Sequence, residues 1–130
     1  MTNIKTHKKY DEPRGCLLPI SFSELDFEPK RIFIVNNVPK NTIRGKHAHY
    51  ETRQFLICTS GKVEVKLDYN HHIETYLLEK GMSIVIPKLV WDTHEFLTSD
   101  TEIVVLSSTD YDENDYIRDY EYFKMTTSNY

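Results

Sequence analysis

The chain lacks the features that mark membrane, disulfide-rich or nucleic-acid-binding proteins. Its 130 residues hold two cysteines, Cys16 and Cys58, which are far apart and lack the CxxC spacing of zinc and redox sites. No apolar run has the length of a membrane span or of a signal-peptide core, and a net charge of −4 leaves no basic stripe for nucleic acid. These absences predict a cytoplasmic protein that binds neither membrane nor nucleic acid.

The length and composition fit one folded unit. With 39% apolar and 28% charged residues, the chain is too apolar for disorder and long enough for one hydrophobic core. It contains no internal repeat, low-complexity stretch or linker. We therefore expect a single domain over residues 1–130. Cys58 lies in an apolar run and is expected to be a buried thiol.

Short apolar segments recur about every ten residues, separated by glycine, proline and asparagine. Residues 62–68 alternate cleanly, which directs Val63, Val65 and Leu67 to a core, whereas residues 54–58 are apolar almost throughout, as in a strand covered on both faces. This pattern predicts an all-β fold, a small antiparallel sandwich or barrel. Its strands are expected at residues 31–35, 54–58, 62–68, 73–77, 82–86 and 102–107.

The last part of the chain has a different pattern. Residues 112–123 are rich in aspartate and tyrosine, and apolar or aromatic side chains recur there at helical spacing: Tyr116, Ile117, Tyr120 and Phe123. This spacing predicts a short C-terminal helix whose aromatic side chains pack on the sheets.

The histidine pair His47 and His49 is the strongest candidate for a site. Residues two apart on a strand point to one face, so the two imidazoles converge if that face is the interior. Such a pair can bind a metal or act as a proton-transfer base. The alternative is two exposed histidines on a surface strand.

The metal hypothesis can be compared with the pattern of metal-binding cupins. There a glutamate follows the histidine pair, and a third histidine follows a later proline. Here the glutamate position falls at Arg53 or Gln54, which are not usual metal ligands, and the third histidine position falls at Asp92. The pattern therefore does not predict a metal. Two alternatives remain: Glu51 can replace the missing carboxylate, and His47, His49 and His94 can form a three-histidine site.

A proton-transfer site needs a group that titrates near neutral pH and donors that hold a substrate. Neutral histidine supplies the first. Arg44 and Arg14 offer bidentate donors for a phosphate, and Trp91 offers an aromatic surface for a sugar or a base. A core tryptophan is the alternative for Trp91.

Four segments of the chain closely resemble the sugar 3,4-ketoisomerases, cupins that convert dTDP-4-keto-6-deoxyglucose into its 3-keto isomer. These segments are residues 44–49 (RGKHAH), 54–63, 90–91 and the tail 111–120 (YDENDYIRDY). The likeness extends from about Arg14 to Phe123. The histidine motif together with the tail is much more specific than an HxH pair alone.

The resemblance implies a jelly-roll (cupin) barrel that works as a homodimer without metal or organic cofactor on a dTDP-sugar. It implies that His47 is the catalytic base, that His49 and Arg44 are its neighbours in the site, and that the substrate contacts also include Arg14, Gln54, Phe33 and Trp91. The product of such enzymes supplies 3-amino-3,6-dideoxysugars for surface glycans such as O-antigen lipopolysaccharide.

One position departs from the family. Its members often carry a tyrosine as the acid that delivers a proton to C4, and that position is Phe33 here. Phenylalanine has no proton to donate, so His49, a water or another side chain must do so; by residue type the candidates are Tyr50, Tyr76 and His94. The C4 configuration of the product is left open, and Arg14 matches a position associated with that choice.

Three other functions remain as alternatives at this point. The chain can be a non-catalytic cupin that binds a nucleotide sugar, a metal-dependent small cupin enzyme, or an epimerase of the related dTDP-sugar type.

Overall fold

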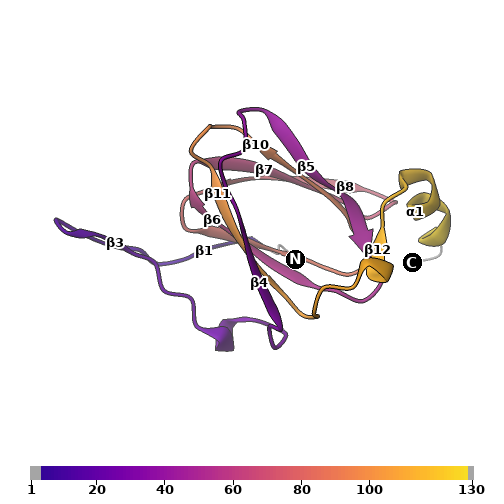
Figure 1. Cartoon of the computed structure of the whole chain (residues 1–130), viewed down its shortest axis with the longest axis horizontal. Coiled ribbons are helices and arrows are strands. Elements are labelled where there is room, and N and C mark those ends of the chain that lie inside the picture. The colour runs from indigo at the N-terminus through magenta and orange to yellow at the C-terminus, as the bar shows by residue number, and fades with distance from the viewer. Residues whose placement is uncertain (1–3, 129–130) are drawn as a thin grey trace.

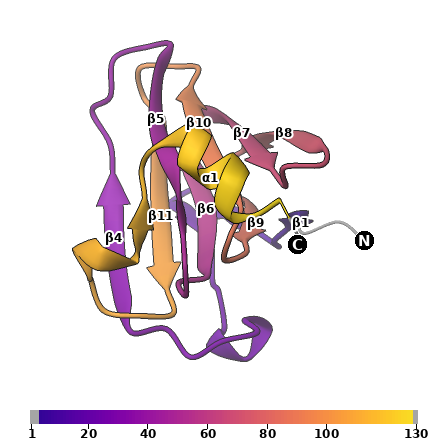
Figure 2. The ribbon, with the colours of Figure 1, turned by 90° about the vertical axis from the view of Figure 1, so that its right-hand side faces the viewer.

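The computed structural model describes residues 4–128, in which two five-stranded antiparallel sheets face each other (Figures 1 and 2). The first, here the β6 sheet, has the order β1 (Ile4–Thr6), β9 (Met82–Ile86), β6 (Gln54–Ser60), β11 (Glu102–Ser107) and β4 (Arg31–Val35). The second, the β5 sheet, has the order β12 (Tyr116–Ile117), β5 (Thr42–His49), β10 (Trp91–Phe96), β7 (Lys62–Asp68) and β8 (Ile73–Glu79). The predicted all-β cupin-like fold is confirmed as two facing sheets; no closed barrel forms among the described residues.

The core lies between the two sheets. Val63, Val65 and Leu67 of β7 are fully buried, as their alternation predicts. Leu56 and Cys58 of β6 face them from the other sheet. Cys58 is the buried thiol expected from the sequence, and burial raises its pKa to about 11.

Strand β6 is covered on both faces, which explains its nearly continuous apolar sequence. Phe55 and Ile57 point away from the core and are still only 4% exposed. The segment that contains the 3-10 turn η1 (Phe22–Glu24) covers them, and its packing side chains are Leu18, Ile20, Leu25 and Phe27. The outer face of β6 is therefore covered by another segment of the same chain, as its continuous apolar sequence predicts.

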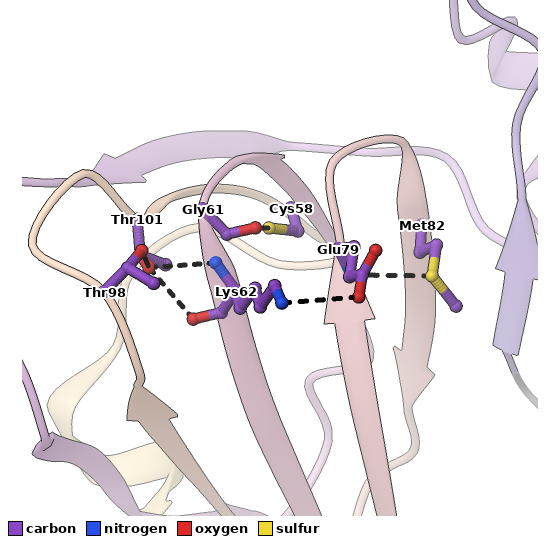
Figure 3. Close-up of polar contacts among 7 residues, drawn as sticks. All are labelled: Cys58, Gly61, Lys62, Glu79, Met82, Thr98 and Thr101. Atoms are coloured by element: carbon purple, nitrogen blue, oxygen red, sulfur yellow. Dashed lines mark hydrogen bonds and ion pairs between the residues drawn. The ribbon is translucent and has the colours of Figure 1, made fainter.

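The turn between β6 and β7 is held by a threonine pair (Figure 3). Thr101 Oγ1 accepts from Lys62 N at 3.1 Å and donates to Lys62 O at 2.9 Å. Gly61 has φ +70°, and an added Cβ would lie 2.4 Å from Thr98 Oγ1 and 2.6 Å from Thr101 Cα. Glycine is therefore required at this turn for both its conformation and its lack of a side chain.

The helical prediction for the tail is correct for its end and wrong for its middle. Helix α1 spans Tyr120–Thr126, with Asp119 Oδ1 capping Tyr122 N at 2.9 Å. Before it come the 3-10 turn η2 (Glu113–Asp115) and the short strand β12, in which Tyr116 pairs with His49. The spacing of the aromatic residues suits a helix, but pairing with the free edge of β5 prevails at Tyr116 and Ile117.

The segment after β1 forms a hairpin arm, β2 (Tyr10–Glu12) and β3 (Gly15–Leu17), that projects from the body (Figure 1). It leaves the molecule on the side opposite to α1. Cys16 is exposed in this arm.

Among residues 4–128, no helix has the length and apolar character to cross a membrane.

Candidate active site

A bulge in β5 sets the direction of the site residues. Gly45 and Lys46 have φ of +87° and +60°, and the register with β10 shifts there, so that His47 pairs with Asp92 and Arg44 pairs with His94. Paired residues of neighbouring strands share a face, and Asp92 and His94 are two apart. The bulge therefore directs Arg44, which lies an odd number of residues before His47, to the same face as the histidine pair.

The histidine pair lies on the inner face of the β5 sheet, with one tyrosine against both rings. The ring centroids of His47 and His49 are 4.9 Å apart, and the Tyr116 ring lies 5.2 Å from His47 and 4.5 Å from His49. Tyr116 comes from β12, directly opposite His49. The His47 side chain is 16% exposed, whereas the His49 residue is 2% exposed, so His47 is the more accessible imidazole.

A buried acidic group lies beside the pair. Asp92 is 0% exposed, and its Oδ1 atom lies 3.9 Å from His47 Nε2 and 2.7 Å from His94 Nε2. The shorter contact lacks the alignment of a hydrogen bond, so its attraction is mainly electrostatic. Three imidazoles and one carboxylate thus gather at one place between the sheets.

Both histidines of the motif are held in their neutral form. Burial is the main cause that lowers the pKa of His47; His94 and Arg118 lower it further, and Asp92 opposes them. Burial and the neighbouring His47 lower the pKa of His49 to about 4, against the charges of Asp92 and Asp115. A neutral, partly accessible imidazole at neutral pH is the state that a general base requires.

Two arginines and two tyrosines lie next to the histidines. Arg118 stacks on Tyr116 at 4.1 Å, the rings of Tyr116 and Tyr111 are 5.8 Å apart, and Arg31 lies 5.5 Å from the Tyr111 ring. Tyr111 is 58% exposed. We call these four residues the cationic rim. Guanidinium groups beside aromatic rings offer charge for phosphate and stacking surface for a base.

The rim is anchored in the β6 sheet. Arg31 Nη2 and Gln54 Nε2 both donate to Ser107 Oγ, at 3.4 Å and 3.3 Å, along one cross-strand row. Gln54 is therefore a buried residue of this row, next to Arg31. Phe33 lies two residues further along β4, packs against the core and contacts Arg31 at 5.5 Å.

The other residues predicted to bind substrate lie in different places. Arg44 is exposed on β5, beside His94. Arg14 is in the hairpin arm with its side chain 88% exposed and paired with Glu12 at 3.0 Å, so its own chain does not bring it to the histidines. Trp91 faces the opposite side of the β5 sheet and packs with Phe123 and Ala48 beneath α1, which is the position of a core tryptophan.

The three candidates for the missing acid separate clearly. Tyr50 donates to Tyr122 at 3.3 Å at the surface, and Tyr76 on β8 donates to Glu74 at 2.9 Å. His94 lies against the acidic group beside His47, with its Nε2 atom 2.7 Å from Asp92 Oδ1.

Sequence reasoning missed most of the surroundings of the pair. The sequence pattern marks Asp92 only as a replaced metal-ligand position, not as a partner of His47, and it predicts a helix at Tyr116. Arg31, Tyr111 and Arg118 were not singled out. Arg31 had a usable signal, since it lies on the same strand face as Phe33, two residues away.

The metal hypothesis finds no support in the described part of the chain, where no three histidine, cysteine, aspartate or glutamate side chains are arranged to hold a metal ion. Glu51, the suggested carboxylate, is exposed beyond the end of β5.

The low pKa of His49 makes folding stability depend on pH. A histidine with a pKa near 6.5 unfolded and about 4 folded stabilises the fold fully above 6.5, and this contribution is lost as the pH falls toward 4. Between pH 7 and pH 5, the unfolding free energy of His49→Gln should therefore fall by about 2 kcal/mol less than that of the wild type, as measured by urea titration.

His72→Gln, at an exposed histidine, is the matched control and should leave that pH dependence unchanged. Burial also lowers the pKa of His7 and of His47, so the His49→Gln variant keeps the part of the slope that these two histidines cause. Equal slopes in wild type and His49→Gln would show that His49 is readily protonated in the folded protein.

Known proteins are similar to this chain in sequence and in fold. Residues 1–128 match the family described as FdtA: WxcM-like, C-terminal. The TDP-4-oxo-6-deoxy-alpha-D-glucose-3,4-oxoisomerase of Aneurinibacillus thermoaerophilus is 35% identical over 120 residues, which cover 90% of this chain and 86% of the relative.

Two solved enzymes have closely similar structures. A 3,4-ketoisomerase from Helicobacter canadensis superposes with a TM-score of 0.88 at 28% identity, over 99% of this chain and 100% of that one. QdtA, a sugar 3,4-ketoisomerase from Thermoanaerobacterium thermosaccharolyticum solved with TDP, gives 0.87 at 30% identity, over 97% of this chain and 95% of that one. The resemblance first drawn from the histidine motif and the tail is confirmed: the chain belongs to the FdtA family, together with these sugar 3,4-ketoisomerases.

Proposed function

We propose that this protein isomerises a TDP-4-keto-6-deoxyhexose, moving the keto group from C4 to C3. The observation that carries the proposal is the partly accessible, neutral His47 beside the cationic rim, in a chain of this family. TDP and TDP-4-keto-6-deoxyglucose are bound in structures of the Thermoanaerobacterium enzyme, the latter to a variant of it. The comparisons favour an isomerase over a non-catalytic binding protein, a metal-dependent cupin or an epimerase.

The reaction needs a base and a stabilised oxyanion. The C4 carbonyl acidifies the proton on C3, and His47 removes it to form an enediolate. His49 Nε2 is buried without a hydrogen-bond partner among the described residues, so a neutral His49 has a ring nitrogen free to bond the sugar. Hydrogen-bond donors aimed at the developing charge lower the barrier without reorganisation. Proton transfers of this kind require no redox cofactor.

The nucleotide acts as a handle. Arg31 and Arg118 carry the charge suited to a diphosphate, and Tyr111 offers an exposed ring for the thymine base. Arg44 lies on the same strand face as His47 and is a further phosphate donor in this proposal. Binding energy from the nucleotide then positions the sugar ring against His47. The 3-keto product suits an aminotransferase, which places an amino group on C3.

We also propose that the protein is a homodimer, formed through the exposed side chains of β4 at the edge of the β6 sheet. Strand β4 is an edge strand, and its outward side chains Ile32 and Ile34 are 61% and 58% exposed. Phe22 and Leu17 of the adjoining segment and arm are 60% and 64% exposed. Isoleucines on an open edge strand favour association, and a second copy would also cover the arm and bring Arg14 to a neighbouring site.

The role of His47 is tested by His47→Asn. Loss of the base should reduce conversion of TDP-4-keto-6-deoxyglucose by at least about 100-fold, because general base catalysis contributes on that order. TDP binding, followed by calorimetry, should persist because the cationic rim is intact. Turnover retained in His47→Asn would overturn the assignment of the base, and TDP binding by a wild type that never turns over would favour a binding protein.

The dimer is tested by Ile34→Asp. A charge placed on the proposed interface should convert a dimer at micromolar concentration into a monomer in sedimentation velocity. Ile43→Asp, at a 45% exposed isoleucine on the β5 sheet, is the matched control and should stay dimeric. A monomeric wild type, or equal behaviour of the two variants, would contradict the proposed interface.

A further inference from the structure

The buried carboxylate of Asp92 requires an explanation that the base alone does not give. Among residues 4–128, neither oxygen of Asp92 has an aligned hydrogen bond. His94 Nε2 also lacks one, although it lies 2.7 Å from Asp92 Oδ1. A carboxylate removed from water without donors is strongly unfavourable unless a positive charge lies against it or it takes up a proton. His94 is the nearest group that can carry such a charge.

The motif glycine allows this arrangement. A Cβ at Gly45 would lie 2.9 Å from the Asp92 backbone oxygen, 3.1 Å from Asp92 Oδ1 and 3.3 Å from His94 Cε1. Any larger residue would displace the carboxylate or the imidazole, apart from the strain at φ +87°. The glycine of the RGKHAH segment therefore brings the Asp92–His94 pair close to the strand that carries His47.

One oxygen serves both imidazoles. Asp92 Oδ1 is the atom that approaches His47 Nε2 and also His94 Nε2. The carboxylate can therefore stabilise whichever ring is protonated, and it gives the proton a short path from one ring to the other. An isolated base would gain nothing from such a bridge, whereas a reaction that removes one proton and returns another would.

We propose that Asp92 and His94 form the second proton-transfer element of the isomerisation, in which His94 returns a proton to C4 and Asp92 is the positioning residue for both histidines. This inference rests on the proposed isomerase function. It supplies the donor that Phe33 cannot provide, and it uses a histidine that lies against the acidic group beside the base.

The protons balance over one turnover. His47 takes the C3 proton, and the electrons of that bond form the C3–C4 double bond while O4 becomes negative. The hydroxyl proton on O3 passes to O4, which leaves the negative charge on O3. The C3 carbonyl then forms as the C3–C4 electron pair takes a proton from the His94 imidazolium to C4. His47 ends protonated and His94 neutral, and transfer through Asp92 or solvent restores the starting state.

The charges around His47 define the expected pH effect. Asp92 and His94 face it from β10, Tyr116 from β12, Arg118 from beyond β12 and His49 from its own strand. Burial lowers the pKa of His47 most, Asp92 raises it, and His94 and Arg118 lower it further. In Asp92→Asn the acid limb of kcat/KM should therefore move to lower pH while turnover falls, whereas a residue that only supports the fold would leave that limb in place.

The decisive test separates proton removal from proton return. In deuterated water, His94→Gln should still exchange the C3 proton of recovered TDP-4-keto-6-deoxyglucose within about tenfold of the wild-type rate, because His47 is intact. Conversion to the 3-keto sugar should fall by at least about 100-fold. Mass spectrometry of recovered substrate and of product gives both rates.

Glu95→Gln is the matched control, since Glu95 lies on β10 between the site and the strand end and pairs with Ile43 away from the histidines. It should leave both rates and the pH profile unchanged, and TDP binding with unchanged melting temperature shows that each variant is folded. Equal loss of exchange and conversion in His94→Gln, or no loss of either, would overturn the inference. The inference would also be overturned if Tyr116→Phe, and not His94→Gln, retained C3 exchange while losing conversion to the 3-keto sugar. Failure of the wild type to convert the sugar would instead refute the proposed function.

Discussion

The antiparallel pairing of β5 with β10 is the constraint on which the site depends. The surroundings of His47 follow from this register, in which His47 lies opposite Asp92 and Arg44 lies opposite His94. The bulge at Gly45 and Lys46 is part of the constraint, because a regular strand would direct Arg44 and His47 to opposite faces. Without the close approach at Gly45, the buried carboxylate would lie further from both imidazoles.

The tail of the chain completes the site from the other edge of β5. Asp115 accepts from Glu51 N at 2.9 Å and Thr52 N at 3.1 Å and also bonds the Thr52 hydroxyl, so it fixes the loop that follows His49. Tyr116 then pairs with His49, and Tyr120 donates to Asp68 Oδ2 at 2.6 Å. The acidic and aromatic residues that give the tail its unusual composition are thus largely structural, and their effect is to bring Tyr116 and Arg118 to the histidines.

How much the sequence could predict follows from the range of the interactions involved. Alternation with period two is local, so the strands, the buried Val63 and the shared face of His47 and His49 could all be predicted. The direction of Trp91 could not be predicted. As neighbours on one strand, Trp91 and Asp92 point to opposite faces, but the sequence does not show which of these faces is the inner one. Arg31, Tyr111 and Arg118 lie on separate segments, and only tertiary pairing brings them together. Tyr116 and Ile117 fit a helix by spacing, and their pairing with β5 depends on an edge that local sequence does not reveal.

In the proposed reaction, this site moves a proton between neighbouring carbons of a keto sugar without redox chemistry. The most direct measurement is proton NMR of chelator-treated protein with TDP-4-keto-6-deoxyglucose in deuterated water. We expect conversion to the 3-keto isomer with deuterium at C4. The coupling pattern of the ring protons in a parallel run in ordinary water gives the C4 configuration. Unchanged substrate with its C3 proton fully retained would contradict the proposed reaction.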